Sequence, residues 1–214
     1  MDNTTNLLSK SRSPQPHKFF ERHLDNDLNL MSNYLQEQFK RIENNEIPLG
    51  PQLDYNAFPD TNSITTSEWY RFNAFQFYLP EMFNLLRAVK SMTVEACEYY
   101  GINFEDQYYH AQAWFNINYS HKGKLNWHDH AENGAPTFHG YYCVNAEPST
   151  THYKVGDNYV DNINKNNRAI LSETGHPHAM ADWDWEGPRI TIAYDVFPGS
   201  HMYTAWEQHW VPLL

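Results

Sequence analysis

The chain has 214 residues and a formal net charge of −11, a length that suits one domain with a buried core. An acidic surface repels phosphate backbones, so general nucleic-acid binding is not expected. Two cysteines, Cys97 and Cys143, are too few for a disulfide-rich scaffold or a cluster of thiolate metal ligands. The polar N-terminus does not resemble a signal peptide and no apolar run is long enough to span a membrane, so we expect a cytoplasmic location.

The first predicted helix follows an irregular N-terminal segment. Residues 1–25 are polar and contain several Ser and Pro residues, and we expect a flexible or irregular lead-in there. Over residues 28–42 the apolar residues recur at helical spacing. Asn26 or Asp25 is the expected cap of this helix.

A second helix is predicted from Pro80, which fits a first helical position, to Gly101, which fits a helix terminator. After Gly101 the period changes from helical to alternating, as in strands with two different faces. Strands are expected at residues 109–119, 139–144, 168–172 and 189–197. Two helices followed by several antiparallel strands predict an α+β, mostly β fold, namely a β-sandwich or barrel backed by helices.

Two of these strands have a coherent polar face. Trp114 and Asn118 share it on the first strand, and Arg189 and Thr191 share it on the last. A helix would cover the opposite, apolar face, and the polar face could then line the mouth of a ligand-binding barrel. An ordinary strand with one solvated face explains the alternation equally well.

Twelve histidines include two H-x-H pairs, His128/His130 and His176/His178. In a strand, residues i and i+2 point to the same face, so such a pair aims two imidazoles at one point, and neutral imidazole binds Fe, Zn and Cu. A single pair is expected by chance, but His178 is followed 11 residues later by Arg189, which could hold a carboxylate bidentately inside a barrel. Surface or core positions are the plainer interpretation for the other histidines, and we adopt it for His17, His23, His110, His121, His152, His201 and His209.

Five segments, taken in order, resemble the double-stranded β-helix (jelly-roll, cupin-like) core of Fe(II)/2-oxoglutarate-dependent oxygenases. More narrowly, they resemble the 2-oxoglutarate oxygenases encoded by marine phages and bacteria. The segments are AWFNIN at 113–118, NWHDH at 126–130, FHGYYCVN at 138–145, HPHAM at 176–180 and RITIAYDV at 189–196. The residues before Trp114 carry no motif of this family.

The resemblance implies a site for Fe(II), 2-oxoglutarate and O2. The implied metal ligands are His128, His130 and His178. The residues implied to hold 2-oxoglutarate are Arg189, which pairs with its far carboxylate, Thr191, which assists, and Tyr142 and Asn118, which flank it. The implied reaction decarboxylates 2-oxoglutarate to succinate and hydroxylates an unidentified substrate, which is a small molecule, a peptide or a protein.

The motif departs from the widespread form of the family at one ligand. That form is H-x-D, whereas His130 stands here at the position of the carboxylate. A three-histidine site is one interpretation, and a site of His128, Asp129 and His178, reached through a local bulge, is the other. Asp195 stands where the narrower group tends to have Asn.

The resemblance implies one oxygenase-like domain at 26–214, with helices over about 26–100 and the β-helix core over about 105–200. A homodimer is compatible with it, and a phage-encoded chain would work in the host cytoplasm.

Two other functions remain open: a cupin-like metal enzyme that does not use 2-oxoglutarate, and a non-catalytic β-barrel binding module with incidental histidines. Arg189 argues against the cupin-like enzyme, because an inward guanidinium needs a carboxylate partner.

Overall fold

A computed structural model describes residues 16–47, 49, 64–69, 71–119, 127–130, 137–181, 183, 185, 187–199 and 210–214. The helices are α1 (Leu28–Glu43), α2 (Pro80–Tyr100) and the short 3₁₀ helices η1 (Thr66–Glu68) and η2 (Ala74–Gln76). The strands are β1 (Phe20–His23), β2 (Ile64–Thr65), β3 (His110–Asn118), β4 (Phe138–Asn145), β5 (Thr150–Val155), β6 (Asn158–Ile163), β7 (Arg168–Glu173), β8 (His178–Met180), β9 (Arg189–Phe197) and β10 (Val211–Pro212).

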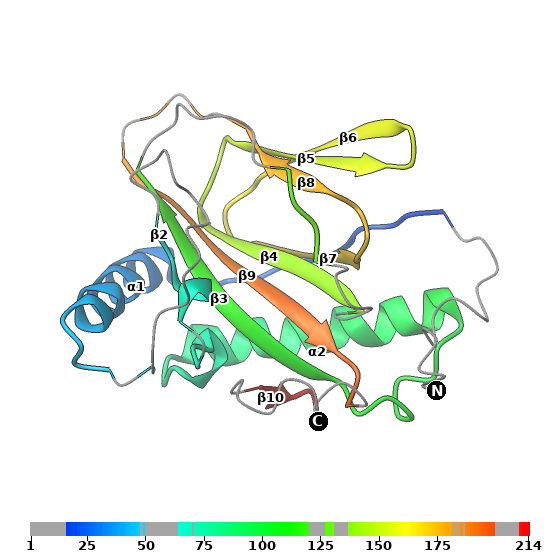
Figure 1. Cartoon of the computed structure of the whole chain (residues 1–214), viewed down its shortest axis with the longest axis horizontal. Helices are drawn as coiled ribbons and strands as arrows, with labels where there is room; N and C mark the ends of the chain where they lie inside the picture. The colour runs from blue at the N-terminus through cyan, green and yellow to red at the C-terminus, as the bar shows by residue number, and fades with distance from the viewer. Residues whose placement is uncertain are drawn as a thin grey trace, which may run out of the picture.

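The strands form two antiparallel sheets (Figure 1). The main sheet has the order β1-β7-β4-β9-β3-β10, with β2 also paired to β3, and the small sheet has the order β6-β5-β8. The helices cover one face of the main sheet and the small sheet lies over the other (Figure 1). This mostly β architecture with two helices confirms the predicted fold class.

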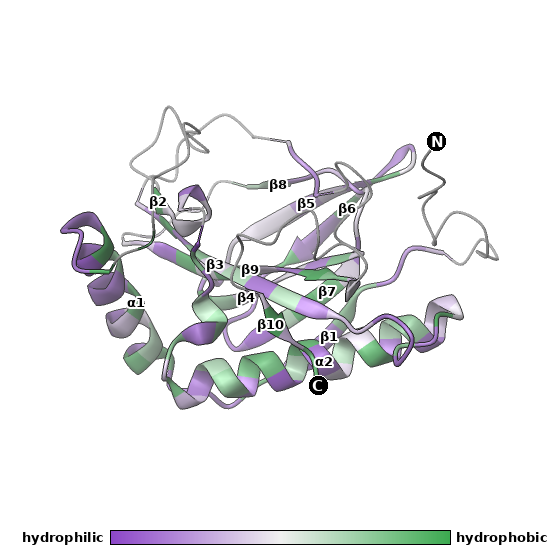
Figure 2. Ribbon diagram, turned by 60° about the horizontal axis from the view of Figure 1, so that its bottom comes forward, coloured by the Kyte–Doolittle hydropathy of each residue, from purple (hydrophilic) through white to green (hydrophobic). Residues whose placement is uncertain are grey.

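Two hydrophobic clusters fill the space on either side of the main sheet. The larger one joins the apolar faces of α1 and α2 to one face of the sheet and includes Met31, Leu85, Phe115 and Tyr142. Hydrophilic and hydrophobic residues alternate along both helices, as expected for helices with one buried side (Figure 2). The smaller cluster lies between the two sheets and includes Tyr153.

The helix boundaries follow the expected capping chemistry with one correction. Asp27, and neither Asn26 nor Asp25, caps α1, because its side chain accepts a hydrogen bond from the backbone N–H of Leu30. α2 begins at Pro80 and ends before Gly101, whose left-handed conformation (φ 68°) closes the helix, as predicted. Neither helix, nor any other in the described part of the chain, is long and apolar enough to cross a membrane.

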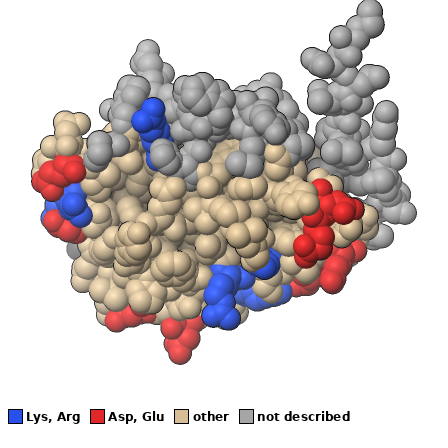
Figure 3. Space-filling model, turned by 90° about the horizontal axis from the view of Figure 1, so that it is seen from below, with Lys and Arg blue, Asp and Glu red and all other residues tan. Residues whose placement is uncertain are grey.

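Part of the N-terminal segment that was expected to be irregular is instead an ordered strand. β1 pairs along its whole length with β7, and Phe20 is buried in the larger cluster. Ion pairs hold this segment to α2: Glu95 accepts from Lys18 at 3.3 Å and from Arg22 at 2.9 Å. Seen from the side of α2, uncharged side chains form the centre of the visible face, and acidic and basic side chains lie mostly around its edge, in places next to one another (Figure 3).

Candidate metal centre

Three histidines from two separate segments meet at the edge of the small sheet. The backbone N–H of His128 donates to the carbonyl of His178 at 3.1 Å, and that of His178 donates back at 2.8 Å. The ring of His128 lies 4.4 Å from that of His178 and 5.5 Å from that of His130, measured between centroids. One ring nitrogen from each residue lies within 4.8 Å of the others. The structure therefore brings together the three residues that the sequence suggests as ligands.

One carboxylate orients two imidazoles beside this group. Asp195 contacts Nδ1 of His130 at 3.1 Å and Nδ1 of His139 at 2.7 Å. Because an ionised carboxylate only accepts hydrogen bonds, both rings donate to it from Nδ1. The Nε2 atom of His130 is buried and has no hydrogen-bond partner in the described part of the chain. A bound cation would satisfy this nitrogen, and a carboxylate behind a histidine is the usual support of a metal ligand.

The charges of the group suit a cation. Burial lowers the pKa of His178 well below its usual value, and the neighbouring His139, His128 and His130 lower it further, so this ring is neutral at pH 7. Burial alone would raise the pKa of Asp195, but the two imidazoles outweigh it and lower the pKa to about 2. Asp195 is therefore ionised, and the site holds a negative charge next to a neutral imidazole lone pair.

The geometry favours His130 over Asp129 as the second ligand. In the described part of the chain, the potential ligand atoms that gather around His128 and His178 include the ring nitrogen of His130 and no oxygen of Asp129. A bulge that would turn Asp129 inward is not needed to complete a set of three. The acid of the H-x-D motif has a counterpart in Asp195, which contacts His130 from the other side.

The predicted anchor Arg189 lies on the same face of the main sheet as Asp195. The side chain is buried, and its Nε donates to Ser149 Oγ at 3.0 Å. No Asp or Glu of the described residues forms an ion pair with this guanidinium, whose pKa is lowered by burial. A buried cation without an anion is costly. Because Ser149 occupies Nε, the two terminal nitrogens are left to meet a carboxylate.

Two further predicted residues share this face. Asn118 lies directly across from Arg189 in the β3–β9 pairing, and Thr191 lies two residues farther along β9. Both side chains are buried, and no described residue hydrogen-bonds Nδ2 of Asn118. An amide donor and a guanidinium that face the same space are complementary to an anionic ligand.

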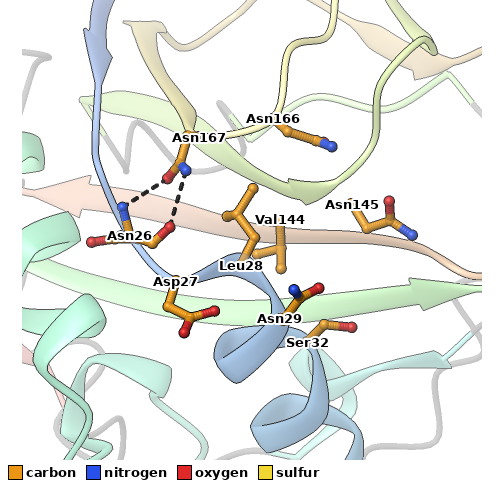
Figure 4. Close-up of a pocket in the computed structure, with 9 residues that line it drawn as sticks. All are labelled: Asn26, Asp27, Leu28, Asn29, Ser32, Val144, Asn145, Asn166 and Asn167. Atoms are coloured by element: carbon orange, nitrogen blue, oxygen red, sulfur yellow. Dashed lines mark hydrogen bonds between the residues drawn. The ribbon is translucent and has the colours of Figure 1, made fainter.

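Tyr142 lies on the opposite face, which corrects its predicted position beside the co-substrate. Its ring is part of the larger cluster under the helices, and its hydroxyl contacts the side chains of Asn26 and Asn167. Those two asparagines line a pocket of about 530 Å³ at the start of α1 (Figure 4), where the side chain of Asn167 also hydrogen-bonds the backbone of Asn26. We therefore leave Tyr142 out of the proposed site.

The adjacent Tyr141 faces the small sheet, and its hydroxyl donates to Asn164 at 2.7 Å.

His139 and Asp195 were not identified as site residues from the sequence. The alternation along the last predicted strand does place Asp195 on the face of Arg189, so a signal for it was present. The predictions for His121, His201 and His209 lie outside the described residues.

No family model matches the sequence, and no curated protein matches it. Solved structures do match the fold. A prolyl hydroxylase of Trichoplax adhaerens, in complex with a peptide fragment of hypoxia inducible factor, is 12% identical with a TM-score of 0.59, over 93% of this chain and 89% of that one. A prolyl-4-hydroxylase of Pseudomonas putida is 11% identical with a TM-score of 0.55, over 85% and 93%.

A third match is the epimerase SnoN in complex with Fe3+ and alpha-ketoglutarate, 10% identical with a TM-score of 0.51, over 85% of this chain and 79% of that one. At this level of identity the matches define the fold. The chain has the double-stranded β-helix fold of Fe(II)/2-oxoglutarate-dependent oxygenases. The narrower likeness to proteins of marine phages and bacteria is not supported by these matches.

Replacing Asp195 by Asn is expected to weaken metal binding by about 10- to 100-fold. An amide is neutral and accepts at only one end, so it can hold the Nδ1 proton of only one of the two imidazoles, and it no longer strengthens His130 as a ligand through a negative charge. Calorimetric titration with Mn2+ measures the change. Asp161→Asn is the matched control, because Asp161 contacts His152 at 2.6 Å in an exposed pair. Unchanged affinity in Asp195→Asn would contradict the supporting role.

Proposed function

We propose that this chain is an Fe(II)- and 2-oxoglutarate-dependent dioxygenase that hydroxylates an unidentified substrate. The observation that carries the proposal is the guanidinium of Arg189, which is buried on the same sheet face as the acid that supports the histidine cluster and forms no ion pair with a described Asp or Glu. A cupin-like site would leave that charge without a partner, whereas a dicarboxylate bound to a metal supplies one. The fold supports the same conclusion.

Each residue has a distinct task in this proposal. His128, His130 and His178 would hold Fe(II), and three ligands on one side leave the remaining coordination positions open. Arg189 would bind the far carboxylate of 2-oxoglutarate, with Thr191 and Asn118 beside it. When bound, iron and 2-oxoglutarate supply the oxidising chemistry, which couples loss of carbon dioxide from 2-oxoglutarate to hydroxylation of a C–H bond.

Ser149 fixes the direction of the anchor. Its Oγ accepts from Arg189 Nε and from Asn164 Nδ2 at 2.9 Å, and it donates to the carbonyl of Ala146. Because its hydrogen bonds lock the hydroxyl in place, the guanidinium plane is held before any ligand arrives. Preorganisation of this kind lowers the entropic cost of binding a carboxylate.

Anaerobic addition of Fe(II) and 2-oxoglutarate to the purified protein tests the proposal. We expect a visible metal-to-ligand charge-transfer band that needs both components and saturates at one equivalent of each. Fe(II) alone and Fe(II) with succinate are the controls, because succinate lacks the 2-oxo group that chelates the metal. Iron binding without a band would favour a cupin-like enzyme, and no iron binding would favour a non-catalytic module.

A further inference from the structure

A second group of potential metal ligands lies outside the candidate centre. It consists of His17, which precedes β1, Glu173 at the end of β7, and His176 in the turn that leads to β8. The Oε1 atom of Glu173 lies 3.3 Å from Nε2 of His176 and 3.9 Å from Nδ1 of His17. The two imidazole rings lie 4.3 Å apart, edge to face. Two imidazoles thus converge on one carboxylate oxygen.

The histidine of the N-terminal segment is buried without satisfying its polar atoms. Only 6% of the His17 side chain is exposed. Among the residues that the structure describes, neither Nδ1 nor Nε2 has a hydrogen-bond partner. A buried ring nitrogen without a hydrogen-bond partner is destabilising, so a buried imidazole that lacks both partners calls for an explanation. The interpretation of His17 as an ordinary core or surface histidine does not provide one.

We infer that His17, Glu173 and His176 form a second site for a divalent transition-metal ion, with Zn2+ as the ion that suits them best. Two imidazoles and one carboxylate are a known ligand set for zinc, with bonds of about 2.0–2.2 Å. Ligand atoms at that distance from a tetrahedral ion lie about 3.4 Å apart. The separations of 3.3 and 3.9 Å are close to this spacing. Water would complete the coordination.

This site is separate from the three-histidine centre. Tyr153 is buried between them, with its ring 5.3 Å from that of His178 and 6.5 Å from that of His17. His176 and His178 flank Pro177 and belong to different groups of ligands. The inference does not depend on the proposed oxygenase activity, since neither Arg189 nor 2-oxoglutarate takes part in it.

The site would tether the N-terminal segment to the turn that positions β8. His17 lies just before β1. Glu173 is the last residue of β7, and His176 lies in the turn between β7 and β8. β8 begins two residues later with His178, the distal ligand of the candidate centre. An ion at the second site would therefore cross-link two segments that are distant in sequence, the N-terminal segment and the turn between β7 and β8, as structural zinc ions do.

Titration of the metal-free, full-length protein with Co2+ and with Zn2+ tests the inference. Co2+ reports its coordination through its visible absorption, and Zn2+ is counted by calorimetry. We expect two equivalents of Zn2+ on the wild type and one equivalent on His17→Ala, His176→Ala and Glu173→Gln. His23→Ala is the matched control, because His23 is an exposed histidine in the same segment, and it should keep two equivalents.

The equivalent of Zn2+ that each variant retains at the three-histidine centre shows that the variant is folded. If a histidine variant fails to fold, Glu173→Gln still tests the site, because glutamine has the same shape as glutamate. His128→Ala should lose the other equivalent and keep this one. Trypsin cleavage after Lys18 should slow on Zn2+ addition in the wild type and not in His17→Ala. Equal Zn2+ stoichiometry in the wild type, His17→Ala and Glu173→Gln would overturn the second site. The remaining outcome is that the wild type binds a single equivalent of Zn2+ that is lost in His17→Ala and kept in His128→Ala. That result would support the second site and would remove the proposed iron centre.

Discussion

His178→Ala and His128→Ala are each expected to abolish Fe(II) binding at the three-histidine centre. Either change removes one of three ligands, and the backbone bridge between the two residues cannot replace an imidazole nitrogen. The loss should exceed the roughly 10- to 100-fold that follows removal of a supporting residue. Iron content after anaerobic loading and desalting measures the effect. Working in a His17→Ala background removes the contribution of the second site.

Two neighbouring residues serve as controls for this result. His176→Ala and Asp129→Ala should retain the iron of the three-histidine centre, because neither side chain contributes to that group of ligand atoms. Full occupancy in His128→Ala or His178→Ala would remove the proposed ligand set. If Asp129→Ala alone destroyed the centre, the ligands would be His128, Asp129 and His178.

Loss of the Arg189 side chain is expected to weaken 2-oxoglutarate binding at least about thirtyfold. Truncating one partner of a buried, hydrogen-bonded charge pair costs on the order of 2–5 kcal/mol of binding free energy, part of it because the other charge stays buried without a partner. Lys cannot reproduce the planar fork of Arg, so Arg189→Lys should recover only part of the affinity. Calorimetric titration of 2-oxoglutarate into Mn-loaded wild type, Arg189→Ala and Arg189→Lys provides the comparison.

Metal content should be the same in these three proteins, since Arg189 contributes no ligand atom to the candidate centre. Wild-type affinity for 2-oxoglutarate in Arg189→Ala would place the anchor elsewhere. Absence of binding to the wild type would remove the oxygenase proposal and leave the cupin-like or non-catalytic alternatives.

The elements that the sequence predicted well are those with a clear period and a clear end. α2 has an amphipathic pattern, a proline at its start and a glycine at its end, and each of these features appears in the structure. β3 is equally clear because its intermediate and buried positions alternate. The hairpin of β5 and β6 is not among the predicted strands, although its two-residue turn at Gly156 and Asp157 is typical of hairpins.

The predicted position of Tyr142 was wrong because β4 lacks a clear alternation of buried and exposed residues. β4 is buried on both faces, so nearly every position of the strand is apolar or buried and alternation carries no signal. A shift by one residue exchanges the two faces of a strand, and Tyr141 and Tyr142 cannot be distinguished in such a pattern. The paired positions of His139 and Asp195 depend on the register of β4 against β9, which a local pattern does not contain.

Asp195 stands behind an imidazole and does not belong to the three-histidine ligand group itself. Coulomb attraction falls with distance and grows in proportion to the charge of the ion. Withdrawing a carboxylate from direct contact therefore removes more stabilisation from a trivalent ion than from a divalent one. Three neutral imidazoles with an outlying acid should thus raise the reduction potential of bound iron, so that it stays ferrous in air longer than iron bound directly by a carboxylate.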